Sequence, residues 1–229
     1  MPRTEARVGA KRVTDLTVTV GAETKSPPST DMRVALERHR RGPGFWQVTS
    51  VSQSLHTGSH IDSALHCFPD GGTTAEIPLE NVIGEAFVLD CSYAEPEQPI
   101  EVRDLEKSYT GVDEELILIV RTDWTDRSWG RFPEFFTRSP YLTEEAAEWL
   151  TARRPRALGF DFFEEYSARL PDFSSEDFVC HRLMLGARVP LLEQITNLSA
   201  VGKTRFDFFA PFYKIAGTEG APARFFALS

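Results

Sequence analysis

Runs of hydrophobic residues separated by short polar segments are the dominant pattern along this chain. The longest run, Leu116 to Val120, lies inside Glu115–Thr122, where β-branched and leucine residues follow one another without interruption. Such a run is typical of a strand that is buried on both faces of a sheet. Shorter apolar runs and two segments rich in Phe and Tyr predict further strands. These strands are Gly84–Cys91, Ala157–Phe162, Val189–Glu193, Arg205–Lys214 and Ala223–Leu228.

Two helices are predicted between these strands. Val102–Ser108 is expected to form a short helix. A longer one begins after Thr143, a suitable N-cap because two glutamates follow it in the first turn, and Pro155 ends this helix just after Arg153. Strands that alternate with helices indicate an α/β fold. We therefore expect residues 1–229 to form a single α/β domain.

The segment Ser26–Gly44 interrupts this alternation. It has two adjacent prolines near its start and the sequence Gly42-Pro43-Gly44 at its end. Such residues favour turns, so we expect an irregular excursion with a short helical piece inside it. The basic run Arg38–Arg41, which contains His39, is expected to lie on the solvated surface.

The overall charge argues against nucleic acid as a partner. The chain has 25 Lys and Arg residues against 34 Asp and Glu residues, which gives a formal net charge of −9. An anion of this size repels a phosphate backbone. No apolar stretch is long enough to span a membrane, and residues 1–13 contain charges but no apolar leader segment. Three cysteines without C-x-x-C spacing fit a reducing compartment, so we expect a cytoplasmic location.

The groups best suited to chemistry lie close together in one short segment. His56, His60, Asp62 and His66 all occupy even positions. In an extended strand this parity places them on one face, and in a helix His56 and His60 would also share a face. A single histidine usually just satisfies local hydrogen bonds, but four such groups in register favour a metal site. Two histidines and a carboxylate with open coordination positions suit Zn²⁺, Mn²⁺ or Fe²⁺.

Two cysteines adjoin histidines and raise the alternative of a thiol nucleophile. Cys67 follows His66, and Cys180 precedes His181. Adjacent residues of a strand point to opposite faces, so we expect both thiols to pack away from the histidines.

The pattern His56-x-Gly58-x-His60-x-Asp62-x-x-x-His66 resembles the signature of the metal-dependent cyclase family, which includes bacterial kynurenine formamidases and isatin hydrolases. After Asp161, kynurenine formamidases usually carry a Thr-Pro-Ser-type segment, whereas this chain has Phe162–Tyr166, which we expect to line the substrate pocket. The resemblance covers most of the chain. Its further segments are Phe68–Gly72, Ile77–Glu80, Gly84–Asp90, Arg121–Trp124, Leu158–Asp161, His181–Leu185, Val189–Glu193 and Thr196–Leu198.

The resemblance implies a fold, an assembly and a metal site. The fold would be a swivelling β/β/α domain, which forms a homodimer or a larger homo-oligomer. His56, His60 and Asp62 would bind a divalent metal, with Zn²⁺ or Mn²⁺ the expected ion.

A second set of roles follows from the same resemblance. His181 and Glu193 match a later His and Glu that complete a second metal site in some members. An acid that ends an apolar strand, as Glu193 does, is also costly to bury unless it is paired or coordinated. His66 would be the acid/base residue or a ligand of the second ion.

Three functions are compatible with these residues. The first is metal-dependent hydrolysis of an amide, lactam or related carbonyl in an aromatic small molecule, in which His66 shuttles a proton. The second is ring closure of an aromatic or polyketide-type substrate, which would require the exclusion of water. The third is a metal-binding protein without catalysis. The mass of the product separates the first two, because hydrolysis adds water and dehydrative ring closure removes it.

Overall fold

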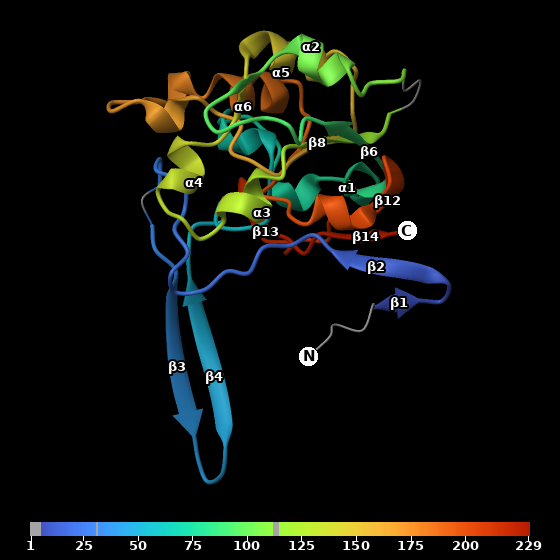
Figure 1. The fold of residues 1–229 in the computed structure, drawn as a ribbon. Helices are drawn as coiled ribbons and strands as arrows, with labels where there is room; N and C mark the ends of the chain where they lie inside the picture. Colours follow the sequence, from blue (N-terminus) through green and yellow to red (C-terminus); the bar gives the residue numbers. More distant parts are fainter. Residues whose placement is uncertain (1–5, 31, 112–114) are drawn as a thin grey trace.

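In the described residues, ten strands form one mixed sheet (Figure 1). The computed structural model describes residues 6–30, 32–111 and 115–229. Across the sheet the strands follow the order β1-β2-β14-β12-β6-β8-β10-β11-β5-β13. Their bounds are Arg7–Val8 (β1), Lys11–Asp15 (β2), His60–Asp62 (β5), Ile83–Asp90 (β6), Ile117–Arg121 (β8), Ala157–Phe160 (β10), Leu191–Glu193 (β11), Arg205–Phe209 (β12), Gly220–Pro222 (β13) and Phe226–Leu228 (β14).

The remaining elements lie outside this sheet. Two strand pairs stand apart: Ala35–Arg41 (β3) with Trp46–Ser52 (β4), and Pro99–Ile100 (β7) with Tyr141–Leu142 (β9). The helices are Leu79–Val82 (α1), Val102–Glu106 (α2), Trp124–Ser128 (α3), Glu134–Thr137 (α4), Glu144–Thr151 (α5) and Val179–Gly186 (α6). Short 3₁₀ helices span Ala64–His66, Thr74–Glu76, Ser167–Arg169, Ser175–Asp177 and Leu198–Val201.

The centre of the sheet is parallel and buried on both faces. Strands β6, β8, β10 and β11 run parallel to one another. In β8, Leu118 and Val120 pack into the core on one face, while Ile117 and Ile119 pack into a second core on the other. Because neither face meets water, these strands have unbroken apolar sequences.

Helices α2, α5 and α6 lie together over the first face of the sheet (Figure 1). They contribute Leu105, Leu150 and Met184 to the core on that side, and all three side chains are fully buried. The longer helix begins as its sequence predicts, since the Thr143 hydroxyl accepts a hydrogen bond of 3.2 Å from the Ala146 amide. This capping satisfies one of the amide donors that the first turn of a helix leaves free.

The strands expected from apolar runs are confirmed. β6, β8, β10 and β11 each lie within about a residue or two of their predicted ranges. The two closing segments are shorter than expected, since β12 covers only the first half of Arg205–Lys214 and β14 the second half of Ala223–Leu228. A mixed α/β fold with one large sheet is therefore confirmed, whereas the swivelling arrangement and the single-domain extent stay predictions. Residues 1–5, which belong to the N-terminal segment judged to lack a leader, lie outside the described residues.

The expectation for Ser26–Gly44 is wrong in its second half. Residues Ala35–Arg41 form β3, which pairs with β4 as an antiparallel hairpin, and no helical piece occurs among the described residues of the segment. The strand was missed because almost every side chain in it is exposed, so it has no apolar periodicity. The Arg38–Arg41 run and His39 do lie on the surface, as predicted.

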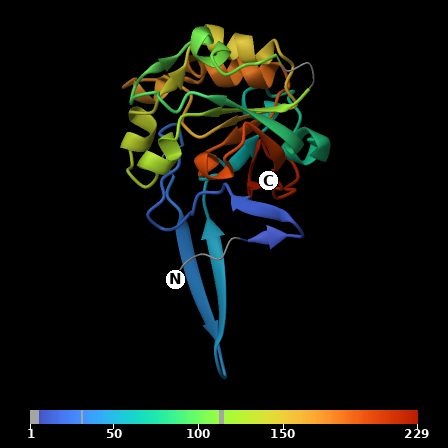
Figure 2. The same cartoon turned by 45° about the vertical axis from the view of Figure 1, so that its right-hand side comes forward.

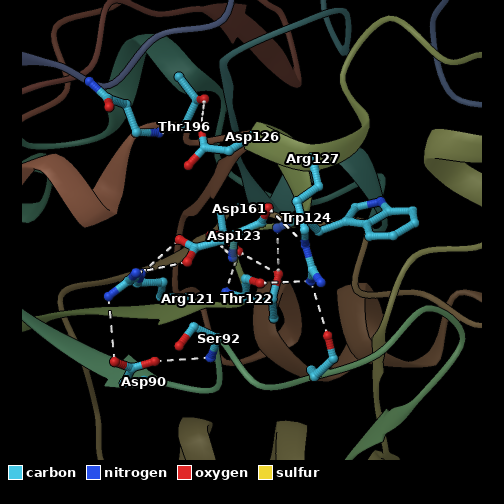
Figure 3. A network of polar contacts seen from close by, with 12 residues as sticks. Asp90, Ser92, Arg121, Thr122, Asp123, Trp124, Asp126, Arg127, Asp161 and Thr196 are labelled. Carbon is cyan, nitrogen blue, oxygen red and sulfur yellow. Dashed lines mark hydrogen bonds and ion pairs between the residues drawn. The ribbon is translucent and has the colours of Figure 1, made fainter.

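A polar network joins the end of β8 to the end of β10 (Figure 3). The buried Asp161 carboxylate accepts hydrogen bonds from the Thr122 amide, the Thr122 hydroxyl and the Asp123 amide, each 2.7 Å long. The Asp161 carbonyl accepts a further bond from the Thr125 amide at 2.8 Å. This network fixes the start of the chain segment that continues to Phe163 and Glu165.

We expect Asp161→Asn to lower the free energy of unfolding by about 1–3 kcal/mol, because an amide nitrogen cannot accept a bond and leaves a buried donor unsatisfied. Burial raises the pKa of Asp161 to about 7 against the opposing effect of its hydrogen bonds, so urea unfolding should be measured at about pH 8. The half-exposed Asp90, which pairs with Arg121 at 3.4 Å, provides the control Asp90→Asn, with an expected loss below about 1 kcal/mol. Equal losses in the two variants would show that the hydrogen bonds of Asp161 stabilise the fold no more than the surface ion pair of Asp90 does.

Candidate metal centre

The histidine segment is mostly a tight turn followed by a short strand. Only His60, Ile61 and Asp62 form β5. Gly58 has φ +71°, and a Cβ at this position would lie 2.2 Å from Val20 Cγ2. Glycine is therefore required both by the backbone conformation and by the close approach of Val20. The turn brings His56 back beside the strand that follows it.

The expectation that all four groups lie on one face of a single strand is wrong, because only two of them belong to a strand. The period of two applies to His60 and Asp62, whereas His56 lies in the turn and His66 in the 3₁₀ helix Ala64–His66. The groups nevertheless converge. The ring centroids of His56 and His60 are 5.2 Å apart, and those of His56 and His66 are 4.1 Å apart in a stacked arrangement.

Asp62 lies between the imidazole rings and offers one oxygen to each side. Its Oδ1 is 2.8 Å from His56 Nδ1 and 3.3 Å from His60 Nε2. Its Oδ2 is 3.7 Å from His181 Nε2. Only 1% of Asp62 is exposed, so this carboxylate meets ring nitrogens rather than water. The His56 and His60 rings hold its pKa well below the ordinary value, against the opposing effect of burial.

The later residues, His181 and Glu193, reach the same place from α6 and β11, respectively. Antiparallel pairing of β11 with β5 puts Glu193 directly opposite His60. The ligand atoms of Asp62, His181 and Glu193 all lie within 4.8 Å of one another. The structure thus brings together the six expected site residues, which come from β5, β11, α6 and the turn and 3₁₀ helix on either side of β5: His56, His60, Asp62, His66, His181 and Glu193.

Three of the four site histidines have a partner for their outer nitrogen. His60 Nδ1 is 2.7 Å from the Gly58 carbonyl, His181 Nδ1 is 3.0 Å from Glu165 Oε1, and His56 Nε2 is 3.3 Å from Glu219 Oε1. Histidines that bind metals commonly donate their second ring N–H to such oxygens, which fixes the ring and its tautomer. The inner nitrogens are then His56 Nδ1, His60 Nε2 and His181 Nε2, the same three that face Asp62.

Sequence reasoning missed Glu164, Glu165 and Glu219. The first two follow the apolar strand β10 and are both buried, so the argument applied to Glu193 would have found them too. Glu164 Oε1 lies 2.9 Å from His181 Nδ1, so both glutamates contact the same ring nitrogen. Glu219 lies in an irregular segment before β13 and has no comparable signal in the sequence.

The donor set fits a divalent cation. Among the described residues, Glu193 Oε1 and both Glu164 oxygens are buried without a hydrogen bond, although Glu164 Oε1 lies within ion-pair distance of His181. Burial and the negative charge of Glu164 raise the pKa of Glu193 well above its ordinary value, and the neighbouring His181 ring offsets only part of this effect. A divalent ion would add positive charge at this place, and imidazole with carboxylate is a ligand set that suits Zn²⁺ and Mn²⁺.

His66 differs from the other rings in the site. One edge of it reaches solvent, whereas His56, His60 and His181 are buried. Removal of water from the rest of the ring and the positive charge on neighbouring histidines lower the pKa of His66 to about 4, despite the opposing effect of Asp62. Burial also acts to lower the pKa of His56, but Asp62 and Glu219 outweigh it and raise that pKa to about 9. His66 therefore has a neutral ring at neutral pH.

A small cavity lies between these residues and the N-terminal part of the chain. Its volume is about 30 Å³, enough for one or two water-sized species. Pro27, Ser29 and Thr30 form one wall. Phe163 and Phe178 also line it, so the segment after Asp161 reaches the pocket through Phe163. Phe162 is fully buried in the core instead.

The thiols pack away from the site, although neither lies in a strand as expected. Cys180 belongs to α6 and is buried in the core, and Cys67 packs against the same core. Burial raises the pKa of Cys67 and Cys180, and that of Cys91 to about 12.

We expect the native protein to resist iodoacetamide at about pH 8 and to keep its metal, while the unfolded chain is alkylated at all three cysteines. Rapid loss of activity on modification of Cys67 would instead support this cysteine as a nucleophile.

Comparison with known proteins connects this site to a family. The sequence profile described as "Putative cyclase" matches residues 14–164. The chain belongs to the cyclase family. It is 25% identical to a kynurenine formamidase of Bacillus anthracis over 181 residues, covering 79% of each chain. It is 27% identical to a kynurenine formamidase of Erythrobacter litoralis over 179 residues, covering 77% of this chain and 74% of that protein.

A solved structure shows a similar fold. Isatin hydrolase A from Labrenzia aggregata, bound to benzyl benzoate, matches with a TM-score of 0.79 and 27% identity, covering 96% of this chain and 94% of that one. These cyclase-family relatives are named as hydrolytic enzymes, which confirms the expectation that this chain is an enzyme. None of the helices in the described part of the chain combines the length and apolarity needed to cross a bilayer.

Proposed function

We propose that this protein is a metal-dependent hydrolase that cleaves an amide, lactam or related carbonyl bond in an aromatic small molecule. The arrangement around Asp62 supports this most directly. One buried carboxylate faces the inner nitrogens of three imidazoles, and a neutral fourth ring, His66, stacks beside them. The names of the family relatives point to the same class of reaction.

The first ion would be held by His56, His60 and Asp62. A second would be held by Asp62, His181 and Glu193, with Asp62 offering a different oxygen to each side. When bound, Zn²⁺ or Mn²⁺ polarises a carbonyl oxygen and lowers the pKa of water. The number of ions is tested by the metal content per chain, which should approach two if both sets bind.

His66 would move the proton in this reaction. Its neutral ring has a free edge toward solvent, and its stacking on His56 holds it beside the proposed ligands of the first ion. It would take a proton from the attacking water and deliver it to the leaving nitrogen. A group in this role needs a lone pair at working pH, and the neutral ring of His66 has one.

The substrate would be an aromatic formamide or a fused lactam. Phe163 and Phe178 line the cavity and offer ring faces to an aromatic ligand. The cavity of about 30 Å³ is much smaller than the several hundred Å³ that ligand pockets usually enclose. The wall formed by Pro27, Ser29 and Thr30 would therefore move when the substrate enters.

Product analysis tests the proposed activity. Protein loaded with Zn²⁺ or Mn²⁺ is incubated with N-formylkynurenine, formanilide or isatin, and the products are identified by mass spectrometry. We expect at least one of these compounds to be hydrolysed, and a chelator to stop the reaction. A product that has lost water would favour ring closure, and the absence of any turnover across a wider set of aryl amides and lactams would count against the hydrolase.

We also propose that the protein works in the cytoplasm as a homodimer or larger homo-oligomer. The odd number of cysteines, all free within the described residues, supports a reducing compartment. The expectation that nucleic acid is not a partner stays a prediction from the net charge.

Glu165 is expected to position His181 for the second ion. Its Oε1 accepts bonds from both the backbone amide of His181 (2.6 Å) and the ring Nδ1 (3.0 Å). We expect Glu165→Ala to weaken metal binding by about 10–100-fold, as measured by competition with a chelator. Glu165→Gln keeps an acceptor oxygen and should recover part of the loss. Glu176, an exposed acid beside the same helix, provides the control Glu176→Ala, and equal metal binding in all variants would remove the positioning role.

A further inference from the structure

Three arginines gather where two parallel strands of the sheet begin. Arg154 and Arg156 lie in the connection from α5 to β10, and Arg188 lies in the connection from α6 to β11. Helices α5 and α6 pack against each other over the sheet (Figure 1 and Figure 2). Because β10 and β11 are parallel neighbours, the two connections enter the sheet side by side. All three arginines line one groove of about 600 Å³.

These arginines have no acidic partner. None of the three forms an ion pair with another described residue. Other arginines on the surface do, since Arg138 and Arg224 contact carboxylate oxygens at 3.0 Å and 2.6 Å. Glu115 also lines the groove but forms no ion pair with the described residues. Three unpaired positive charges at one place, in a chain with a net charge of −9, attract an anion to the groove.

The backbone holds two of these arginines in a conformation that favours glycine. Arg154 has φ +50° and Arg188 has φ +60°, in the left-handed region that other residues seldom adopt. After α6, the Arg188 amide donates to the Leu185 carbonyl at 2.9 Å and the Val189 amide to the Met184 carbonyl at 3.2 Å. Glycine usually occupies the Arg188 position in this kind of helix end. An arginine kept at such a position indicates that its side chain is used.

The third arginine is fixed by its surroundings. Arg156 Nη1 donates a hydrogen bond of 2.7 Å to the Glu80 carbonyl. Its guanidinium lies against Gly84, where a Cβ would be 2.5 Å from Nη2. Among the described residues, Arg156 Nε is buried without a partner. A guanidinium that is already held in place loses little conformational freedom when it binds an anion.

A second cavity, of about 360 Å³, adjoins this groove, since Asn81 and Arg188 line both. Its acid, Glu76, is already engaged, because its Oε2 accepts bonds from the Thr73 amide at 2.7 Å and the Thr73 hydroxyl at 2.9 Å. The apolar part of its wall consists of Ala64, Ile77, Pro78 and Pro190. A ligand with an anionic head and an apolar body would therefore find a place for each part.

We propose that the groove binds a small organic anion, with its phosphate or carboxylate group among Arg154, Arg156 and Arg188 and its apolar body in the adjoining cavity. Guanidinium groups present paired N–H donors that match both kinds of anion. This site uses none of the proposed metal ligands and does not depend on the proposed hydrolysis. Ser63 and Ala64, which line the adjoining cavity, directly follow Asp62, so the bound molecule would also contact the segment that leads to His66.

Isothermal titration calorimetry with phenyl phosphate tests the site. We expect the wild-type protein to bind it, and more tightly than inorganic phosphate because the ring fills the apolar cavity. Arg156→Ser should weaken binding by about 10–100-fold, the contribution of a hydrogen bond to a charged group. Arg138→Ser removes an arginine that is paired with Glu97 and should bind as the wild type does. Absence of binding by the wild type, or equal binding by Arg156→Ser, would overturn the proposal.

Glycine at the two left-handed positions separates binding from folding. We expect the double variant Arg154→Gly, Arg188→Gly to unfold at a temperature equal to or above that of the wild type, because glycine adopts this backbone without strain. Its affinity for phenyl phosphate should fall by about 100-fold or more, since two charged contacts are lost. Unchanged affinity would show that these arginines serve only the helix ends, and would overturn the anion site.

Two further comparisons define the place and the kind of anion. His60→Ala, which lacks a proposed metal ligand, should bind phenyl phosphate as the wild type does. Loss of binding in this variant would place the anion at the metal centre and refute the groove. Benzoate in place of phenyl phosphate compares the two head groups, and the tighter ligand identifies the natural one as a carboxylate or a phosphate. Inorganic phosphate bound as tightly as phenyl phosphate would refute the role of the apolar cavity.

Discussion

Replacement of His60 by alanine is expected to abolish tight metal binding and to reduce turnover by more than about 100-fold. Loss of a residue that only orients a metal ligand already costs up to about 100-fold, so loss of a ligand itself should cost more. His60 Nε2 is 3.3 Å from Asp62 Oδ1, and its other nitrogen is held by the Gly58 carbonyl. Its removal takes away a ligand whose direction is already fixed and leaves Asp62 without one of the rings that stabilise its charge.

The measurement is metal content per chain after purification without added metal. His39→Ala is the matched control, because His39 lies on the exposed strand β3 and its replacement should leave both metal content and turnover unchanged. Equal metal content in His60→Ala and the wild type would remove His60 from the metal site.

His66→Ala is expected to lose about 10²–10⁴-fold in turnover while it keeps the first ion, because positioned acid/base groups contribute rate enhancements of that size. His66 stacks on His56 without being one of the rings that face the Asp62 oxygens most closely. Turnover and metal content should be measured on the same preparation. Full turnover would exclude the proton-transfer role, and loss of all metal would make His66 a primary ligand instead.

The parts of the fold that were predictable from the sequence are those in which burial leaves a pattern. β6, β8, β10 and β11 are apolar on both faces because helices and loops cover the sheet on each side. The hairpin of β3 and β4 has no such pattern, since almost all of its side chains are exposed. The turns that place His56 and His66 beside β5 likewise depend on contacts such as Val20 against Gly58, which lie far apart in the sequence.

The candidate site was predictable in its inner residues and only partly in the outer ones. His56, His60 and Asp62 lie within seven consecutive positions, so a local motif identifies them. The register of β11 against β5, which sets Glu193 opposite His60, becomes visible only in the sheet. Glu219 contacts His56 although the two residues are 163 positions apart, and no spacing rule connects positions so distant in the sequence.

The Asp62 site is proposed to cleave a carbonyl bond with water in a metal-dependent reaction. Turnover of an aryl formamide in ¹⁸O-labelled water tests this, with the product analysed by mass spectrometry before and after treatment with a chelator. We expect that one labelled oxygen enters the acyl product, that the chelator stops the reaction and that added Zn²⁺ or Mn²⁺ restores it. A product formed by loss of water, or labelled product at an undiminished rate after the metal is removed, would contradict it.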